Sequence, residues 1–134
     1  MDRKKICYTI PSPSDFYDYL SNIEVYGSAF IINFVYAYEG IPIKGGLRFD
    51  DCQTYRYRIW YLCSEWHIKD AYLTLAKVIN SSWINELKIE GDKTRNDFNL
   101  MNHYIIFLEN IGCYEIISKS WEALPIKEGH WTDH

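Results

Sequence analysis

The sequence predicts a single α+β domain built mostly on antiparallel sheet, with two or three short helices. Runs of β-branched and aromatic residues recur along the chain, one pair of runs has the pattern of a hairpin, and only two segments carry helix start signals. The 134 residues are 48% hydrophobic, with 12 Tyr, 6 Phe and 5 Trp, which is enough apolar surface for one core. We expect the domain to span residues 1–127 and the C-terminal tail, residues 128–134, to fray.

The first two expected elements are a strand and a helix. Residues 6–10 form a β-rich run that Pro11 ends. Residues 12–15 then provide a capping serine, a proline suited to the first helical position and an acid for the first turn. Apolar residues follow at helical spacing, namely Phe16, Tyr19, Leu20 and Ile23. We therefore expect a helix that ends before Gly27.

The middle of the chain predicts strands. Residues 28–38 are rich in Ile, Phe, Val and Tyr, which favours a strand buried on both faces and leaves a helix as the alternative. Three glycines and a proline predict a loop over residues 39–46. Residues 47–52 and 55–59 alternate polar and apolar side chains, as half-buried strands do. Residues 53–54 are then a bulge or a turn between these two strands.

Another strand, a second helix and a loop are expected in the next part of the chain. Residues 72–79 have strand-like composition. Polar residues 80–82 can cap a following helix, and Gly91 suits its end. The polar and charged residues 92–102 are the expected flexible loop.

The clearest local pattern is a hairpin near the C-terminus. Residues 103–109 and 113–118 are β-rich, and three residues ending in Gly112 join them. We expect Gly112 in the left-handed position of the bulge, where a glycine carries no steric cost. Its position would fix the register, and with it the face that each side chain occupies.

Charge and segment lengths exclude several classes of function. The formal charge of −4 argues against nucleic-acid binding, which normally requires a basic surface. This mild charge is also ordinary, and it fits either an inert surface or one that meets a basic partner. The basic N-terminus meets Pro11 and Pro13 before any apolar run, so we expect no secretory signal. The longest apolar stretch, residues 29–37, is too short to span a bilayer. We expect a cytoplasmic protein that binds no membrane.

Residues capable of catalysis or metal binding are scattered. The four cysteines stand far apart, at Cys7, Cys52, Cys63 and Cys113, and no CxxC pair suggests a zinc site. Cys63 and His67 come closest to a catalytic or metal-binding pair, but no signature surrounds them. We expect no enzyme activity, no metal and no cofactor.

Charged residues on the expected strands have structural interpretations. Asp50 and Asp51 are adjacent, so strand alternation sends them to opposite faces, unlike a catalytic carboxylate pair. Glu109 and Glu115 lie in the hairpin and can face each other or one of Arg48, Arg56 and Arg58, and a cross-strand ion pair is the structural interpretation. In residues 55–58 the tyrosines share one face, expected to enter the core, and the arginines share the other.

A series of short motifs in fixed order suggests a family. The order is Gly46-Leu-Arg-Phe49, Tyr55-Arg-Tyr-Arg58, Ala71-Tyr-Leu-Thr-Leu75, Ser82-Trp-Ile84, His103-Tyr-Ile-Ile106, Gly112-Cys-Tyr-Glu-Ile-Ile117 and Ser120-Trp121. Over residues 46–122 the chain resembles a group of small bacterial proteins that are similar to immunity proteins of polymorphic or contact-dependent toxin systems. The resemblance rests on structural residues, so it carries over no catalytic motif.

The resemblance implies a protein that binds and neutralises a cognate toxin domain by blocking its surface or active site. A basic nuclease is the class of toxin that fits an acidic inhibitor. Exposed acids and one aromatic residue are the candidate partner-binding residues: Asp50, Asp51, Trp66, Glu90, Asp92 and Asp97. The alternative is a small-ligand-binding or structural module without catalysis.

Overall fold

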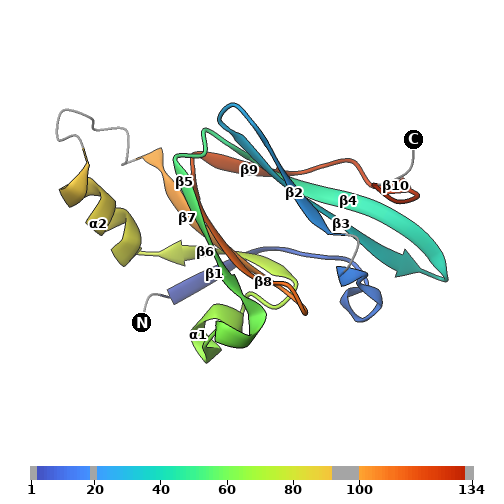
Figure 1. Cartoon of the computed structure of the whole chain (residues 1–134). Helices are drawn as coiled ribbons and strands as arrows, with labels where there is room; N and C mark the ends of the chain where they lie inside the picture. Colours follow the sequence, from blue (N-terminus) through green and yellow to red (C-terminus); the bar gives the residue numbers. More distant parts are fainter. Residues whose placement is uncertain (1–2, 19–20, 92–99, 132–134) are drawn as a thin grey trace.

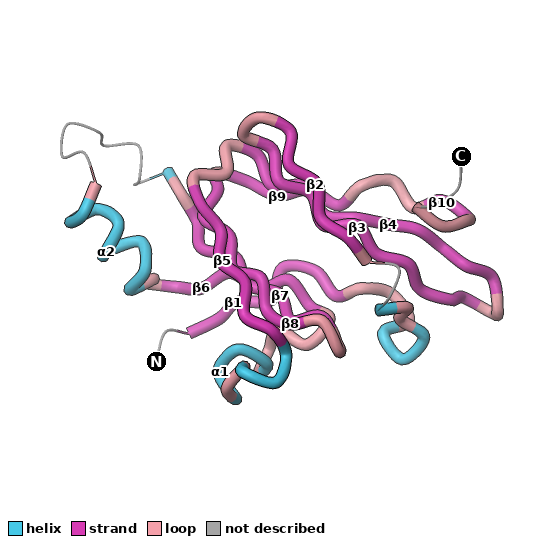
Figure 2. The backbone as a smooth tube through the Cα atoms, in the orientation of Figure 1, coloured by secondary structure: helices cyan, strands magenta, loops and turns pink. Residues whose placement is uncertain are grey.

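Two antiparallel sheets make up most of the molecule (Figures 1 and 2). The computed structural model describes residues 3–18, 21–91 and 100–131. Of the described residues, 55% are in strands, and two short α-helices accompany them, so the domain is richer in sheet than a balanced α+β fold. The expectation of a single, mostly antiparallel domain is confirmed at that level.

Sheet A has five strands in the order β1-β6-β7-β8-β5, each antiparallel to its neighbour. Their bounds are β1 (Arg3–Thr9), β6 (Thr74–Ile79), β7 (Asn102–Leu108), β8 (Gly112–Ser118) and β5 (Thr54–Ile59). The strands β1 and β5 are therefore the two edges of this sheet.

Sheet B has the order β10-β4-β3-β2, and β9 also pairs with β4. Their bounds are β10 (Lys127–Glu128), β4 (Ile41–Asp50), β3 (Ala29–Tyr38), β2 (Asn22–Tyr26) and β9 (Ser120–Ala123). The chain passes from sheet B to sheet A between β4 and β5, and returns between β8 and β9. The two crossings meet where the amide of Lys119 donates to the carbonyl of Asp50.

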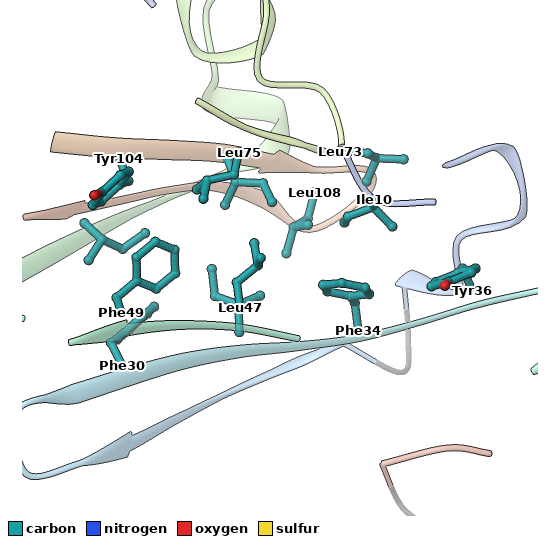
Figure 3. Close-up of a cluster of buried hydrophobic side chains, with 13 residues drawn as sticks. Ile10, Phe30, Phe34, Tyr36, Leu47, Phe49, Leu73, Leu75, Tyr104 and Leu108 are labelled. Carbon is teal, nitrogen blue, oxygen red and sulfur yellow. The ribbon is translucent and has the colours of Figure 1, made fainter. Parts of the chain in front are cut away.

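The main core lies between the sheets (Figure 3). Side chains of sheet A, such as Leu108 and Tyr104, point toward side chains of sheet B, such as Phe34. Strand alternation supplies one inward residue in every two, and each fully buried large side chain contributes roughly 2 kcal/mol. The largest fully buried residues are Phe30, Phe34, Phe49, Ile10, Ile32, Leu47, Leu73, Leu75, Ile105, Ile106, Leu108 and Ile116.

The helices lie on the outer face of sheet A. Trp66 and Ile68 of helix α1 (Glu65–Ile68) pack on a second apolar cluster that includes Ile105 and Phe107. Helix α2 (Ser82–Glu90) lies beside the beginning of β7 (Figure 1). Two 3₁₀ turns, η1 (Pro13–Asp15) and η3 (Trp60–Leu62), complete the described elements.

Several sequence predictions are confirmed. Residues 29–38 form strand β3, and every residue from 29 to 37 is buried, as expected of a strand covered on both faces. The hairpin of β7 and β8 is present, with Leu108 opposite Gly112. Helix α2 begins after Ser81, whose hydroxyl caps it, and ends at Gly91.

The helix expected after Ser12 is wrong. Only η1 forms there, Ser12 makes no side-chain cap, and residues 22–26 are strand β2. Phe16 instead forms a bridge with Tyr36, and Ile23 pairs with Ile32 of β3. Pairing with the long buried strand therefore overrides a local helix signal. Residues 19 and 20 of the expected helix lie outside the described residues.

The loop expected over residues 39–46 is also wrong. Glu39 and Gly40 take φ values of 52° and 78° and form a two-residue turn, after which β4 begins at Ile41. Gly45 and Gly46, which suggested a loop, lie inside this strand and allow neighbouring side chains to pack closely against its backbone. A Cβ atom on Gly45 would lie 2.9 Å from the Phe34 ring, and one on Gly46 would lie 2.9 Å from Leu124.

The C-terminal residues lie against sheet B. Glu128, expected to fray, pairs with Ile43 of β4. The indole of Trp131 donates to the carbonyls of Phe34 and Gly45, at 3.0 and 2.8 Å. Residues 128–131 are therefore held by the sheet, while residues 132–134 lie outside the described residues.

Gly112 is required for a reason other than the one expected. Asn110 takes the left-handed conformation in the turn, with a φ of 60°, whereas Gly112 has a φ of 147°. A Cβ atom on Gly112 would lie 2.2 Å from the carbonyl oxygen of Arg58 on the neighbouring strand. The glycine therefore lets β5 approach β8.

Substitution of Gly112 should be strongly destabilising. We expect Gly112→Ala to cost about 3 kcal/mol or more, because backbone strain and a clash with the β5 backbone add together. Gly40→Ala is the matched control, since it also has positive φ but open space around the added Cβ, and should cost about 1–2 kcal/mol. Urea unfolding measures both, and equal losses would contradict this account.

Candidate functional site

A buried carboxylate on the outer face of sheet A organises the first candidate site. Glu115 is buried in β8, directly opposite Arg56 of the edge strand β5. The guanidinium donates Nε–H to Glu115 Oε2 at 2.8 Å and Nη2–H to Oε1 at 3.0 Å. This bidentate geometry is the strong form of a carboxylate–arginine pair, and it confirms the expected cross-strand ion pair.

The same carboxylate binds an imidazole from the next strand. His103 Nε2 lies 2.8 Å from Glu115 Oε1, and His103 Nδ1 lies 2.7 Å from the hydroxyl of Ser81. That hydroxyl also accepts the amide of Ile84 at 3.1 Å, so it caps helix α2. A continuous chain of hydrogen bonds thus runs from helix α2 through β7 and β8 to β5.

Trp83 of helix α2 covers this chain. Its indole meets the His103 ring edge to face, with centroids 5.2 Å apart. The Arg56 guanidinium carbon lies 4.0 Å from the centre of the indole ring, a cation–π contact that adds to the ion pair. The helix and the edge strand are therefore fixed to the same buried carboxylate.

The surroundings of Glu115 determine its charge. Burial alone would raise the pKa of this carboxyl group, but the hydrogen bonds from His103 and Arg56 outweigh burial and lower its pKa to about 2. Glu115 is therefore ionised at neutral pH. Removal of either partner would leave part of a buried charge unpaired.

The order serine, histidine, carboxylate is also that of hydrolytic triads. In this chain the Ser81 hydroxyl is engaged as a helix cap, and Ser81, His103 and Glu115 are only 5%, 1% and 4% exposed. The Ser81 hydroxyl is committed to the His103 ring and to the amide of Ile84. The geometry supports a structural role, in which the three residues hold helix α2 on sheet A.

Cys63 and His67 do not form a reactive pair. The Cys63 thiol donates to the carbonyls of Arg58 and Ile59, and burial raises its pKa. His67 Nδ1 lies 2.9 Å from the hydroxyl of Ser64, and burial lowers the pKa of this imidazole. Within the described ranges, no group of three or more His, Cys, Asp or Glu residues is arranged to hold a metal ion.

The second candidate site is an exposed aromatic surface on β5 and η3. We define the β5–η3 surface as Tyr55, Tyr57, Trp60, Tyr61 and Leu62. The last three are consecutive in the chain and are 47%, 63% and 61% exposed. Large apolar side chains gathered in this way are typical of protein interfaces, where Tyr and Trp are the usual anchors.

Two tyrosines of this surface, Tyr55 and Tyr57, are held in place by packing on aromatic rings beneath them. Tyr55 packs on Phe30 of the core, with ring centroids 4.5 Å apart. Tyr57 packs on Tyr114 at 4.8 Å and donates its hydroxyl to the carbonyl of Ile111 at 2.6 Å. Their face was predicted correctly, but both rings remain partly exposed at the open edge of the sheet. A rigid aromatic surface loses little side-chain entropy on binding.

The structure does not bring the predicted partner-binding residues together. Asp50 ends β4 and pairs with Arg48 at 2.9 Å, and Asp51 follows it in an exposed turn. Glu90 ends helix α2. Trp66 lies in helix α1, partly covered by the Lys4 ammonium group 4.4 Å from its ring centre. The other two, Asp92 and Asp97, lie outside the described residues.

Sequence reasoning missed most of the β5–η3 surface for identifiable reasons. Tyr55 and Tyr57 were assigned to the core because alternation does not reveal that β5 is an edge strand. Trp60, Tyr61 and Leu62 follow directly, and this run of three large apolar residues beyond a strand end was the available signal. Large apolar residues are more often buried than exposed, so their composition does not mark them as a surface.

Comparisons of this chain with known protein families, with curated proteins and with solved structures gave no match. None of the helices in the described part of the chain has the length and apolar character needed to cross a bilayer.

The Glu115 network predicts how stability varies with pH. The pKa of Glu115 is lower in the folded chain than in the unfolded chain, so its stabilisation is complete above about pH 4.3 and is lost as pH falls toward 2. The shift in the pKa of Glu115 corresponds to a contribution of about 3 kcal/mol to the free energy of unfolding. We expect urea unfolding to show that loss in the native chain.

Two variants isolate this carboxyl group. Glu115→Gln should be less stable than the native chain at pH 7. Its free energy of unfolding should not show the decrease between pH 5 and 2 that protonation of Glu115 causes. Glu90→Gln removes an exposed carboxyl and should keep the native pH profile. The account is contradicted if Glu115→Gln unfolds with the same pH dependence as the native chain.

Proposed function

We propose that this chain is an immunity-type protein that binds a bacterial toxin domain in the cytoplasm and neutralises it by covering its surface or active site. The observation that carries the proposal is the β5–η3 surface. Trp60, Tyr61 and Leu62 stay exposed and belong to neither of the two apolar clusters of the molecule. Keeping such side chains in water is unfavourable, and contact with a partner would recover that free energy.

The exposed aromatic residues lie on a rigid support, as an inhibitor requires. The network of Arg56 with Glu115 fixes β5 to β8, and helix α2 fixes the network in turn. A preorganised surface binds without a large ordering cost. A binding protein of this kind needs shape and charge complementarity and no reactive group.

Charge supports a basic toxin domain as the partner. The chain has a formal charge of −4, and opposite net charges accelerate association at low ionic strength. A basic nuclease is the toxin class that this charge favours. The exposed Asp51 and Glu90 are not among the residues of the β5–η3 surface and would act through the long-range field.

Co-expression tests the proposal. We expect the chain to restore growth and to co-purify when produced with the C-terminal toxin domain of a secreted protein encoded beside it. Trp60→Ala with Tyr61→Ala should weaken binding by about 2 kcal/mol or more without loss of fold, because exposed aromatic anchors carry much of an interface.

Tyr38→Ala is the matched control, because Tyr38 is 57% exposed on sheet B, away from this surface. It should bind and protect as the native chain does. Growth arrest together with failure to co-purify would overturn the proposed function. If Tyr38→Ala weakens binding as much as Trp60→Ala with Tyr61→Ala does, the β5–η3 surface is not the binding surface.

A second candidate function rests on a pocket between helix α2 and the ends of β6 and β7. This open pocket has a volume of about 410 Å³, the size of a small-ligand site. Its polar lining includes Lys77, Asn80, Asn85, Asn102 and His103. This chemistry favours a small phosphate or carboxylate compound, and a thermal shift that Lys77→Ala abolishes would favour this alternative.

A further inference from the structure

The outer edge of β5 presents unpaired backbone groups. Residues 54–59 pair with β8 in continuous register, and just beyond them the amide of Trp60 donates to the carbonyl of Ile111. Hydrogen-bonding residues alternate along an antiparallel ladder. Arg56 and Arg58 therefore direct their backbone groups toward β8, while Tyr55 and Tyr57 direct theirs outward. No backbone group in the described residues pairs with these outward groups.

A hollow lies at the beginning of this edge. It has a volume of about 290 Å³, and its lining includes Thr54 and Tyr55 of β5, Val25 of β2, and Phe30 at the start of β3. Apolar side chains therefore surround much of a space that opens beside the first residues of β5. The other end of the edge leads directly to Trp60 of the β5–η3 surface.

The other sheet edges carry features that discourage strand pairing. Strand β1 begins with Arg3, Lys4 and Lys5 and contains a register shift between Ile6 and Tyr8. In sheet B, β2 is five residues long with Glu24 at its centre, and β9 and β10 are shorter still. Charge, irregularity and shortness are the usual protections of an edge. Strand β5 has neither proline, lysine nor bulge within residues 54–59; its charges are two arginines, of which Arg56 is already paired with Glu115.

We propose that the toxin partner adds an extended segment to β5, as a further strand of sheet A. This inference rests on the proposed function and specifies its binding mode. Backbone hydrogen bonds to Tyr55 and Tyr57 would hold the segment, as in other cases of strand addition. One apolar side chain of the segment fills the hollow beside Tyr55. The segment is locally acidic within an otherwise basic toxin domain, and its acidic side chains face Arg58, because the two arginines are the only charges on β5.

A second copy of this chain does not fit the same edge. Two-fold pairing of β5 with itself must match outward residues with outward residues, as Tyr57 with Tyr57 or Tyr55 with Tyr57. Both of these registers place arginine opposite arginine, Arg56 against Arg58 in the first and Arg56 against its own copy in the second. Registers centred on Tyr55 or Ile59 avoid this but overlap only the ends of the two strands. Like charges directly opposite one another destabilise a strand pair. An acidic strand from another protein removes this repulsion.

Substitution of Tyr57 by proline tests whether the outward-facing N–H group of this residue binds the partner strand. Tyr57→Pro removes an N–H group that the ladder with β8 does not use, at an edge position that tolerates proline. Tyr57→Val is the matched control, because it removes the same ring and keeps the N–H group. We expect Tyr57→Pro to bind the toxin domain about tenfold or more weakly than Tyr57→Val, with both variants folded by circular dichroism.

A charge reversal gives an independent variant if the proline disturbs the fold. Arg58→Glu should weaken binding about fivefold or more by repelling the acidic segment. Lys127→Glu makes the same charge change on β10 of sheet B and should bind as the native chain does. If Arg58→Glu and Lys127→Glu weaken binding equally, net charge alone explains both results. The proposal that an acidic segment faces Arg58 would then be overturned.

Selection from a phage library of random linear peptides tests the edge without the toxin. We expect native protein to enrich peptides that alternate acidic and apolar residues, and Tyr57→Pro to bind these peptides about tenfold or more weakly than Tyr57→Val does. Selected peptides that bind Tyr57→Pro as well as Tyr57→Val, or a library that yields no binder, would overturn strand addition. A toxin that fails to bind the native chain overturns the proposed function, whichever result the peptides give.

Discussion

The structure depends on one buried charge, the carboxylate of Glu115. Three elements of sheet A and a helix meet at this group, because it binds Arg56 of β5 and His103 of β7, and His103 holds the hydroxyl that caps helix α2. A buried carboxylate is stable only when its partners are in place. The ion pair therefore fixes the register of the edge strand, which is a constraint that apolar packing alone imposes less strictly.

The register of β5 has consequences on both of its faces. With Arg56 turned toward Glu115, the alternation of a strand turns Tyr55 and Tyr57 toward Phe30 and Tyr114 at the open rim of the core. The same register decides which backbone groups face water. An exposed aromatic surface and an unpaired strand edge thus both follow from one buried ion pair. Both features are consistent with the proposal that the protein binds another protein.

Local patterns predicted part of this fold. Strand β3 and the β7–β8 hairpin were foreseeable because an unbroken apolar run and a glycine turn are short-range signals, and the pairing of Glu115 with an arginine followed from them. The helix expected at Phe16 failed because β3 offered that segment a strand partner, which no local pattern reveals. The contact of Ser81 with His103, and the position of β5 at an edge, depend on strand order. Strand order is a property of the whole fold, so neither could be read from residue spacing.

Amide hydrogen exchange of the free protein, measured by NMR, tests most directly whether β5 is an open edge in the register set by Glu115. The account predicts that the amides of Arg56 and Arg58 are protected, because they donate to β8, and that those of Tyr55 and Tyr57 exchange rapidly. Protection of Tyr55 and Tyr57 in the free chain would contradict it, because the edge would then already be covered.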